Sequence, residues 1–264
     1  MPTITLVWSK LLSKTIVVKV GGSTWESRDA ALDDIVALQR EGQRVVVVHG
    51  GGDLISRWLG IHGVESRFVN GLRFTGEDAM PIVVAVLAGL VNKQLVAGVN
   101  ALGGRAVGLS GADGGCIRGK RRPELGLVGD IEGVDGGLLR SLLDSGYMPV
   151  IAPIGVESGG AQLLNINADT VAGEVAAALK ADYLAFLTNV PGVLDADGKT
   201  MARLSAPQIE SLARDGTISR GMLPKVEACL KASAAGCLAL VIDGRQARGL
   251  RDALEGRISG TRVE

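Results

Sequence analysis

The stretch TIVVKVGG, residues 15–22, decides the fold prediction because it joins a continuous apolar run to a pair of glycines. A continuous run predicts a strand buried on both faces, whereas a strand with one face in water alternates apolar and polar residues. RVVVVHGGG, residues 44–52, repeats the arrangement. Between them, RDAALDDIVALQREG, residues 28–42, has apolar residues at helical spacing and a glycine that predicts the end of the helix.

The rest of the chain continues this alternation, with a helix expected to begin near Asp53 and a polar-tipped hairpin over 115–134. Further strands are expected over 105–111, 147–156, 183–190 and 238–243, and further helices over 76–104, 137–146, 168–182, 205–214, 222–235 and 247–255. Buried strands that alternate with helices imply an α/β fold with a mainly parallel sheet covered on both sides. Ligands of such sheets bind beyond the carboxyl ends of the strands, where the glycine runs fall.

Composition excludes several classes of protein. The 264 residues are 47% hydrophobic, which argues against disorder, and 28 basic residues balance 28 acidic ones, so no overall positive field points to nucleic acid. Three cysteines without a CxxC pair argue against a zinc site and favour a reducing cytoplasm, and the N-terminus shows no export signal. The apolar run at 81–93 is expected to end by Asn92 and Lys93, too short for a bilayer, which needs about 20 residues.

Two glycine-rich turns are the candidates for phosphate binding. The GxGxxG pattern is absent, and the near-Walker stretch GVLDADGKT, residues 192–200, has one residue too many between its glycines. KVGGS at 19–23 and HGGG at 49–52 each follow a predicted buried strand. Consecutive N–H groups in such turns, backed by a helix N-terminus, bind anions. A tight turn between strand and helix, without a ligand, is the alternative for each.

Charged and amide side chains in apolar surroundings indicate where chemistry takes place. Lys19 lies in a predicted buried strand, so its ammonium needs an anionic partner unless it reaches solvent at a strand edge. Lys225 lies near the start of a predicted helix, where a cation is disfavoured unless an anion is close or water solvates it. NINAD places Asn165, Asn167 and Asp169 before an apolar helix, and each polar group there needs a partner.

Together these motifs resemble the amino-acid kinase family, and within it the N-acetyl-L-glutamate kinases. Nearly the whole chain is covered, by VVKVGGS, VVHGGG, FVNGLRFT, LAGLVNKQLV, AVGLSGADGG, LGLVGDI, PVIAPIGV, NINAD, FLTNVPGVL, GMLPKVEAC and IDGR in family order. The resemblance implies a three-layer αβα sandwich around a mainly parallel central sheet, with residues 1–264 as a single domain. It further implies an N-lobe, about 1–175, for the acid substrate and dimerisation, and a C-lobe, about 176–264, for ATP.

The resemblance also implies the chemistry. ATP would transfer its γ-phosphoryl group to the side-chain carboxylate of N-acetyl-L-glutamate in arginine biosynthesis, a reaction that depends on alignment and charge neutralisation. Lys19 and Lys225 would flank the phosphoryl group, and Asp169 would hold both ammonium groups. Mg²⁺ would bridge the β- and γ-phosphates without a dedicated cage of protein carboxylates, so no metal-ligating residue is expected.

The remaining site residues are also implied by this resemblance. Arg73 would grip the α-carboxylate of the substrate and Asn165 would hold the substrate beside it, while Asn167 would satisfy local backbone groups. Gly51 and Gly52 would face the attacking carboxylate and the moving phosphoryl group. The residues expected to contact ATP are Gly21, Gly22, Thr188, Val190 and Gly192.

Three departures from the family pattern and two rival functions remain. Asn189, Arg220 and Ala112 stand where the family usually carries Asp, Gly and Lys, which puts details of the nucleotide grip in doubt. One rival is a kinase for carrier-protein-bound aminoadipate or glutamate, although such enzymes tend to replace NGLR and NINAD. The other is a non-catalytic nucleotide or metabolite sensor on the same fold.

The apolar helix over 77–101 resembles the dimer helix of the family, so a homodimer is expected, with small molecules as the other partners and no membrane or nucleic acid. Arginine-inhibited members carry a longer N-terminal helix that links dimers into hexamers. About 14 residues precede the first predicted strand, which favours an arginine-insensitive dimer, although TLVWSKLL leaves room for a short helix.

Overall fold

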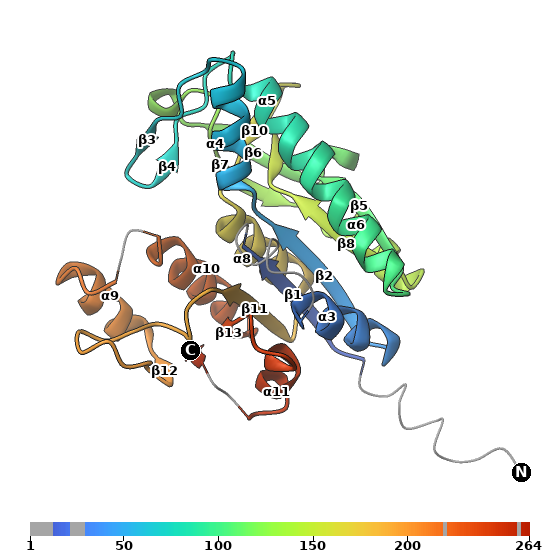
Figure 1. Cartoon of the computed structure of the whole chain (residues 1–264), viewed down its shortest axis with the longest axis vertical. Coiled ribbons are helices and arrows are strands. Elements are labelled where there is room, and N and C mark those ends of the chain that lie inside the picture. Colours follow the sequence, from blue (N-terminus) through green and yellow to red (C-terminus); the bar gives the residue numbers. More distant parts are fainter. Residues whose placement is uncertain (1–12, 22–29, 219–220, 258–259) are drawn as a thin grey trace, which may run out of the picture.

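The computed structural model describes residues 13–21, 30–218, 221–257 and 260–264, and its centre is an eight-stranded sheet (Figure 1). The strand order is β12-β14-β13-β11-β1-β2-β8-β5. From β13 to β5 all neighbours are parallel, whereas β14 is antiparallel to β13, so the prediction of a mainly parallel α/β sheet is confirmed. The strands are β1 (Thr15–Val20), β2 (Arg44–His49), β5 (Ala106–Ser110), β8 (Met148–Ala152), β11 (Tyr183–Thr188), β12 (Arg203–Leu204), β13 (Leu238–Asp243) and β14 (Gly260–Val263).

Helices cover both faces of this sheet because successive residues of each strand point to opposite sides. On β1, Val18 and Val20 enter one core, and Val17 enters the other. The first core also contains α3 (Ala30–Arg40), α4 (Gly52–Ile61) and α11 (Gly249–Leu254). The second contains α7 (Gly137–Asp144), α8 (Ala168–Leu179), α9 (Ala206–Arg214) and α10 (Leu223–Ala234). The result is the expected three-layer sandwich.

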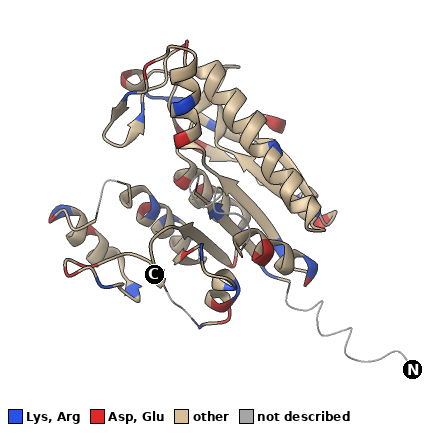
Figure 2. Ribbon diagram, in the orientation of Figure 1, with Lys and Arg blue, Asp and Glu red and all other residues tan. Residues whose placement is uncertain are grey.

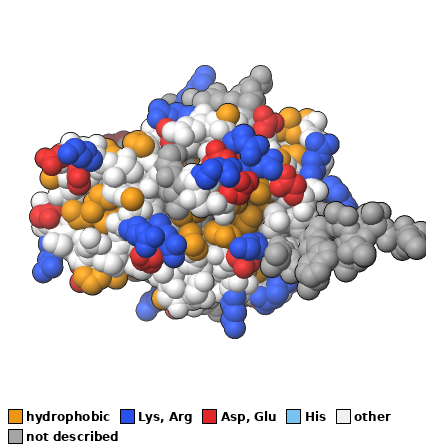
Figure 3. Space-filling view, turned by 90° about the horizontal axis from the view of Figure 1, so that it is seen from below, with side chains coloured by type: hydrophobic (Ala, Val, Ile, Leu, Met, Phe, Trp, Pro, Cys, Tyr) orange, Lys and Arg blue, Asp and Glu red, His pale blue; other side chains and the backbone are white. Residues whose placement is uncertain are grey.

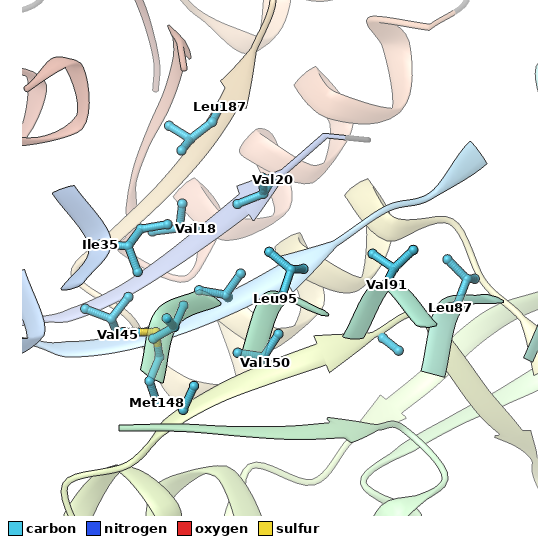
Figure 4. Packing of buried hydrophobic residues seen from close by; sticks show 14 of the residues in the cluster. Val18, Val20, Ile35, Val45, Leu87, Val91, Leu95, Met148, Val150 and Leu187 are labelled. Carbon is cyan, nitrogen blue, oxygen red and sulfur yellow. The ribbon is translucent and has the colours of Figure 1, made fainter. Parts of the chain in front are cut away.

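A long helix crosses the first face, built from α5 (Met80–Val84), the π-helical segment η2 (Ala85–Val91) and α6 (Asn92–Ala101). Leu87, Val91 and Leu95 point from it toward the strands (Figure 4). The helix predicted over 76–104 is confirmed as Met80–Ala101, but the expectation that it is too short for a bilayer was wrong. Its 22 residues, with a mean hydropathy of 1.9 over an 18-residue window, are long and apolar enough to cross a membrane. Figure 2 shows almost no Lys, Arg, Asp or Glu along this helix. One side therefore belongs to the core, and the outer side remains largely apolar.

The predicted single strand over 147–156 is in fact two strands in different sheets. Pro153 separates β8 from β9 (Ile154–Glu157) and is the point at which the chain passes from one sheet to the other. β9 joins a second sheet of order β10-β9-β6-β7, which contains the predicted hairpin as β6 (Ile117–Arg121) and β7 (Gly129–Val134). Sequence patterns did not predict three short strands in this part of the chain: β3 (Phe68–Val69), β4 (Leu72–Arg73) and β10 (Leu163–Asn165).

One face of the molecule can be inspected for its distribution of charge in the space-filling view (Figure 3). On the face drawn in Figure 3, basic and acidic side chains are interspersed, with hydrophobic side chains between them. This agrees with the balance of 28 basic and 28 acidic residues in the sequence. The segment TLVWSKLL and the question of a short N-terminal helix lie outside the described residues.

Candidate functional site

Three charged side chains from distant parts of the sequence meet near the carboxyl ends of β1 and β2. Lys19 is the fifth residue of β1, Asp169 lies in the first turn of α8, and Lys225 lies in the first turn of α10. The Nζ of Lys19 is 2.7 Å from Oδ1 of Asp169, and the Nζ of Lys225 is 2.8 Å from Oδ2. We call these three residues the clamp. Each oxygen of one carboxylate holds one ammonium group, so the clamp has a net charge of +1.

Burial strengthens the electrostatic interactions of the clamp. Lys19 and Asp169 are 8% and 6% exposed, so water screens them little. Burial lowers the pKa of Lys19, Asp169 counteracts this, and Lys225 lowers it further. Burial alone would raise the pKa of Asp169, but the two ammonium groups outweigh it and hold that pKa below its ordinary value. Asp169 is therefore ionised at neutral pH, and an incoming anion would be the natural further partner of the two lysines.

Local structure explains how the clamp forms. Lys19 points to the face of the sheet that carries α8, because its neighbours Val18 and Val20 occupy the opposite face. Helix α8 packs closely on α10, where a Cβ added to Gly173 would lie 2.8 Å from the Cβ of Ala228. Glycine at this crossing thus allows the first turns of the two helices to approach, and the lysine of one helix reaches the aspartate of the other.

The amide before the helix caps α8. Oδ1 of Asn167 accepts hydrogen bonds from the backbone N–H groups of Asp169, at 2.8 Å, and Thr170, at 3.2 Å. The prediction that Asn167 satisfies local backbone is therefore confirmed. A carboxylate in the first turn also interacts favourably with the helix dipole, which helps to keep Asp169 ionised.

A cavity of about 200 Å³ lies beside the clamp and is lined by both polar and apolar side chains. Arg73, 8% exposed, enters it from β4. Its Nη2 donates to Gly52 O at 2.7 Å and to Ser56 Oγ at 3.0 Å, and its Nη1 donates to Ser66 Oγ. These acceptors are neutral, and no salt bridge to Arg73 occurs in the described part of the chain. Asp53 acts on the guanidinium electrostatically but forms no salt bridge with it, so the Arg73 charge is oriented by neutral groups and remains able to bind a carboxylate.

Asn165 lines the same cavity and is tied to Arg73 through Thr75. Its Nδ2 donates to Thr75 Oγ1 at 2.9 Å, and that hydroxyl donates to the carbonyl of Arg73 at 3.1 Å. Thr75 has no exposed surface. Ser56, Ser66 and Thr75 are contributors that sequence reasoning missed. FVNGLRFT contains Thr75, but a hydroxyl in such a motif gives no sign of which amide it will meet.

The glycine turn after β2 lines the cavity too. Gly51 precedes α4 and Gly52 is its first residue, so their N–H groups belong to the helix end that has no intrahelical acceptors. Such a helix start favours negative charge. After β1, Gly21 is half-buried at the strand end, while Gly22 lies outside the described residues.

The predicted nucleotide-side residues lie at the end of β11 and in the turn after it, on the other side of β1 in the sheet. Thr188 Oγ1 donates to Val190 O at 2.7 Å and lies 3.1 Å from Ile242 O. Gly192 is buried in the next turn, and Asn189 is exposed. These contacts are internal, so the role of Thr188, Val190 and Gly192 toward a nucleotide stays a prediction. Of the other two departures, Ala112 begins a 3₁₀ turn and Arg220 lies outside the described residues.

Cysteines do not contribute to this site. Cys116, Cys229 and Cys237 are buried free thiols, and burial raises the pKa of Cys116 to about 11 and that of Cys237 to about 12. Over the described ranges, no group of three or more His, Cys, Asp or Glu side chains could hold a metal ion.

Comparison with known proteins agrees with the geometry. The amino acid kinase family matches residues 14–243. An acetylglutamate kinase of Dehalococcoides mccartyi is 44% identical over 243 residues, spanning 90% of this chain and 89% of its own. An acetylglutamate kinase of Roseobacter denitrificans is 48% identical over 237 residues, spanning 88% and 82%. The crystal structure of smu.665 from Streptococcus mutans matches with a TM-score of 0.84 at 30% identity, over 96% of this chain and 99% of that one. The chain belongs to the amino acid kinase family.

Proposed function

We propose that this chain phosphorylates the side-chain carboxylate of N-acetyl-L-glutamate with ATP, as a step of arginine biosynthesis. The single observation that carries the proposal is the clamp, in which Lys19 and Lys225 converge on Asp169 at 2.7 and 2.8 Å beside an anion-binding glycine turn. Relatives called acetylglutamate kinase, 44% and 48% identical, support the choice of substrate.

The reaction needs little covalent help from the protein. An oxygen of the substrate carboxylate, already deprotonated at neutral pH, forms a bond to the γ-phosphorus while the bond from that phosphorus to the β–γ bridging oxygen breaks. ADP leaves with the electron pair, and an acyl phosphate forms. Lys19 and Lys225 offset the charge on the transferring group from two sides, and Asp169 holds their ammonium groups in place before the substrates arrive.

The acid substrate fits the cavity by charge and by size. In our proposal Arg73 binds its α-carboxylate, since the guanidinium is oriented by neutral acceptors and carries an unneutralised charge. Asn165 holds the substrate beside Arg73, and the N–H groups of Gly51 and Gly52 face the reacting carboxylate and phosphoryl group. The cavity volume of about 200 Å³ suits a small acyl-amino acid.

ATP would then lie over the carboxyl ends of β1, β11 and β13. Gly21, Gly22, Thr188, Val190 and Gly192 are its proposed contacts, with a C-lobe of about residues 176–264 for the nucleotide and an N-lobe of about 1–175 for the acid. Mg²⁺ would arrive on the ATP phosphates and help to neutralise them. Both oxygens of Asp169 hold ammonium groups, so this carboxylate is not a free metal ligand, and phosphate and water would supply the coordination.

The rival functions make different demands on the same site. A kinase for a carrier-bound substrate needs an open path from the cavity for the carrier. A sensor needs no clamp, yet Lys19, Asp169 and Lys225 are all present and paired. Against the carrier-bound rival, Arg73 of NGLR and Asn165 of NINAD are both present and line the cavity, so we keep the free acid as the substrate, in the cytoplasm.

The test is direct. The purified chain is incubated with Mg-ATP and, separately, N-acetylglutamate, N-acetylaminoadipate and glutamate, and acyl phosphate is trapped with hydroxylamine. Product with N-acetylglutamate alone, or fastest with it, is expected. A preference for N-acetylaminoadipate would favour the lysine-type rival, and ATP binding without any product would favour the sensor.

The long helix supports a further part of the proposal, a homodimer. Ala85 and Gly89 are exposed on its outer side, next to other apolar residues, while Leu87 and Val91 face the core. An exposed apolar helix face is typical of an interface. Gel filtration should give a dimer whose size does not change with arginine, and a hexamer would contradict this assembly.

A further inference from the structure

A buried histidine lies directly behind the glycine turn, on the opposite face of the sheet from the clamp. His49, the last residue of β2, is 1% exposed. Its Nδ1 lies 3.0 Å from the carbonyl oxygen of Gly50, and its Nε2 lies 3.2 Å from the side-chain nitrogen of Asn92 on the long helix. His49 and Asn92 contact neither the clamp nor Arg73 in any hydrogen bond of the described residues.

The hydrogen-bond partners determine which ring nitrogen carries the proton. Burial lowers the pKa of His49 to about 4, so the ring is neutral at pH 7. The Gly50 carbonyl can only accept, so Nδ1 must be the protonated nitrogen, and Nε2 then accepts from Asn92. The amide of Asn92 has one orientation as well: its nitrogen donates to Val150 O at 2.9 Å, and its oxygen accepts from Lys93 Nζ at 2.9 Å.

The absence of a side chain at Gly108 leaves space for the side chain of Asn92 beside His49. A Cβ added to Gly108, on β5, would lie 2.0 Å from the side-chain oxygen of Asn92. Any other residue at 108 would therefore push Asn92 away from His49. Asn92 also has no exposed surface, so it holds His49 from a fixed position within the packed core.

The bond to Gly50 has a geometric consequence for the site. No peptide among the described residues is cis, so the Gly50 C=O and the Gly51 N–H point in opposite directions within one plane. When Nδ1 of His49 holds that carbonyl toward the core, the Gly51 N–H must point away from the core. Gly50, Gly51 and Gly52 all line the cavity, so the orientation of this peptide plane sets how the Gly51 N–H is presented to it.

We propose that His49, fixed by Asn92, is a positioning residue that aims the Gly51 N–H at the transferring phosphoryl group. The inference rests on the proposed function, because it assigns a task within that reaction. His49 itself touches no reacting atom. It keeps a backbone donor aligned, which matters most when negative charge develops on the phosphoryl oxygens.

Three variants test separately the hydrogen bonds made by the two ring nitrogens of His49. His49→Asn places an amide nitrogen where Nδ1 was, so it can still donate to Gly50. His49→Gln places its amide where Nε2 was, so it keeps a partner for Asn92 and loses the bond to Gly50. His49→Leu loses both.

We expect kcat of His49→Asn within about threefold of the wild type. His49→Gln and His49→Leu should lose about 30-fold or more, somewhat below the roughly 10²-fold or greater cost of removing an oxyanion donor, because the Gly51 N–H is misaligned and not removed. KM for ATP should change by less than about twofold, since the donor acts mainly in the transition state. The ternary complex with ADP, aluminium fluoride and N-acetylglutamate should weaken in His49→Gln by about the same factor as kcat, while binding of ADP alone stays unchanged. If His49 had only a structural role, its variants would have a lower melting temperature, but kcat and binding of the aluminium fluoride complex would not fall more than ADP binding does.

Equal kcat losses in His49→Asn and His49→Gln, or losses that follow melting temperature alone, would overturn the proposal. A measurement on the wild type covers the case in which variants fail to fold: ¹⁵N NMR of the histidine ring should show protonated Nδ1 and bare Nε2 at pH 7, and the opposite tautomer would also overturn it. Wild-type protein that makes no acyl phosphate would instead refute the proposed function, and this inference with it.

Discussion

The clamp and the Arg73 cavity lie side by side and handle buried charge in opposite ways. In the clamp, Asp169 binds two ammonium groups at 2.7 and 2.8 Å, so one of the two positive charges is compensated within the protein. Arg73 donates only to neutral acceptors, Gly52, Ser56 and Ser66. The clamp is therefore complete before substrate binds, whereas Arg73 awaits a carboxylate. The first arrangement is suited to transition-state stabilisation, and the second to recognition.

The largest effect should come from removing the compensating charge. Asp169→Asn leaves two ammonium groups without their carboxylate, one of them on the buried Lys19. We expect activity to fall by about 10³-fold or more because both lysines lose their fixed position. Unfolding free energy should fall by about 3 kcal/mol, as for other buried pairs that lose one partner. Kinetics and denaturant titration measure the two effects, with the exposed Asp197→Asn as control; normal activity would remove the clamp from the mechanism.

Loss of one ammonium group should be nearly as severe for catalysis and milder for folding. Lys225→Ala is expected to lower kcat by about 10²- to 10³-fold with little change in KM, because the charge matters most in the transition state. Lys231→Ala, on the same helix but in a surface pair with Glu174, is the matched control. If Lys225→Ala weakens substrate binding as much as it lowers kcat, the lysine binds the ground state instead.

At Arg73 the effect should appear in binding of the acid. Arg73→Ala should raise KM for N-acetylglutamate by about 10- to 100-fold, the range for a lost charged hydrogen bond, and leave KM for ATP unchanged. Arg73→Lys should recover only part of this, since an ammonium lacks the planar fork. Arg57→Ala, exposed on α4, controls for charge. A parallel rise in KM for ATP would mean that the two regions do not divide their tasks in this way.

His49 adds a third case, a buried group that stays neutral. Its pKa is lowered to about 4 by burial, so in the unfolded chain it binds a proton more readily. Stability linked to His49 is therefore complete above about pH 6.5 and is lost as pH falls toward 4, by up to about 3 kcal/mol. Denaturant titrations between pH 4 and 7 should show a smaller pH dependence in His49→Asn than in the wild type. Equal slopes would contradict the neutral histidine.

Most of the sheet was predictable from local sequence. Continuous apolar runs such as TIVVKV and RVVVVH give strands where expected, because buried parallel strands require apolar residues on both faces. The strand prediction failed at Pro153, where the apolar pattern continues although the chain leaves the central sheet for the second one. It also failed for β3, β4 and β10, which are too short to show a period.

Local sequence was enough to predict the alternation of strands and helices and the position of the glycine turns. It also indicated that Lys19 and Lys225 need either an anion or solvent, and that Asp169 needs a partner. These features follow from local periodicity and from the cost of burying a charge. The contact of Asp169 with both lysines was implied by the family resemblance alone, and the pairings of Asn165 with Thr75 and of His49 with Asn92 became visible in the folded structure. Such pairings depend on strand order and on helix crossings, which join residues distant in the chain and leave no trace in local sequence.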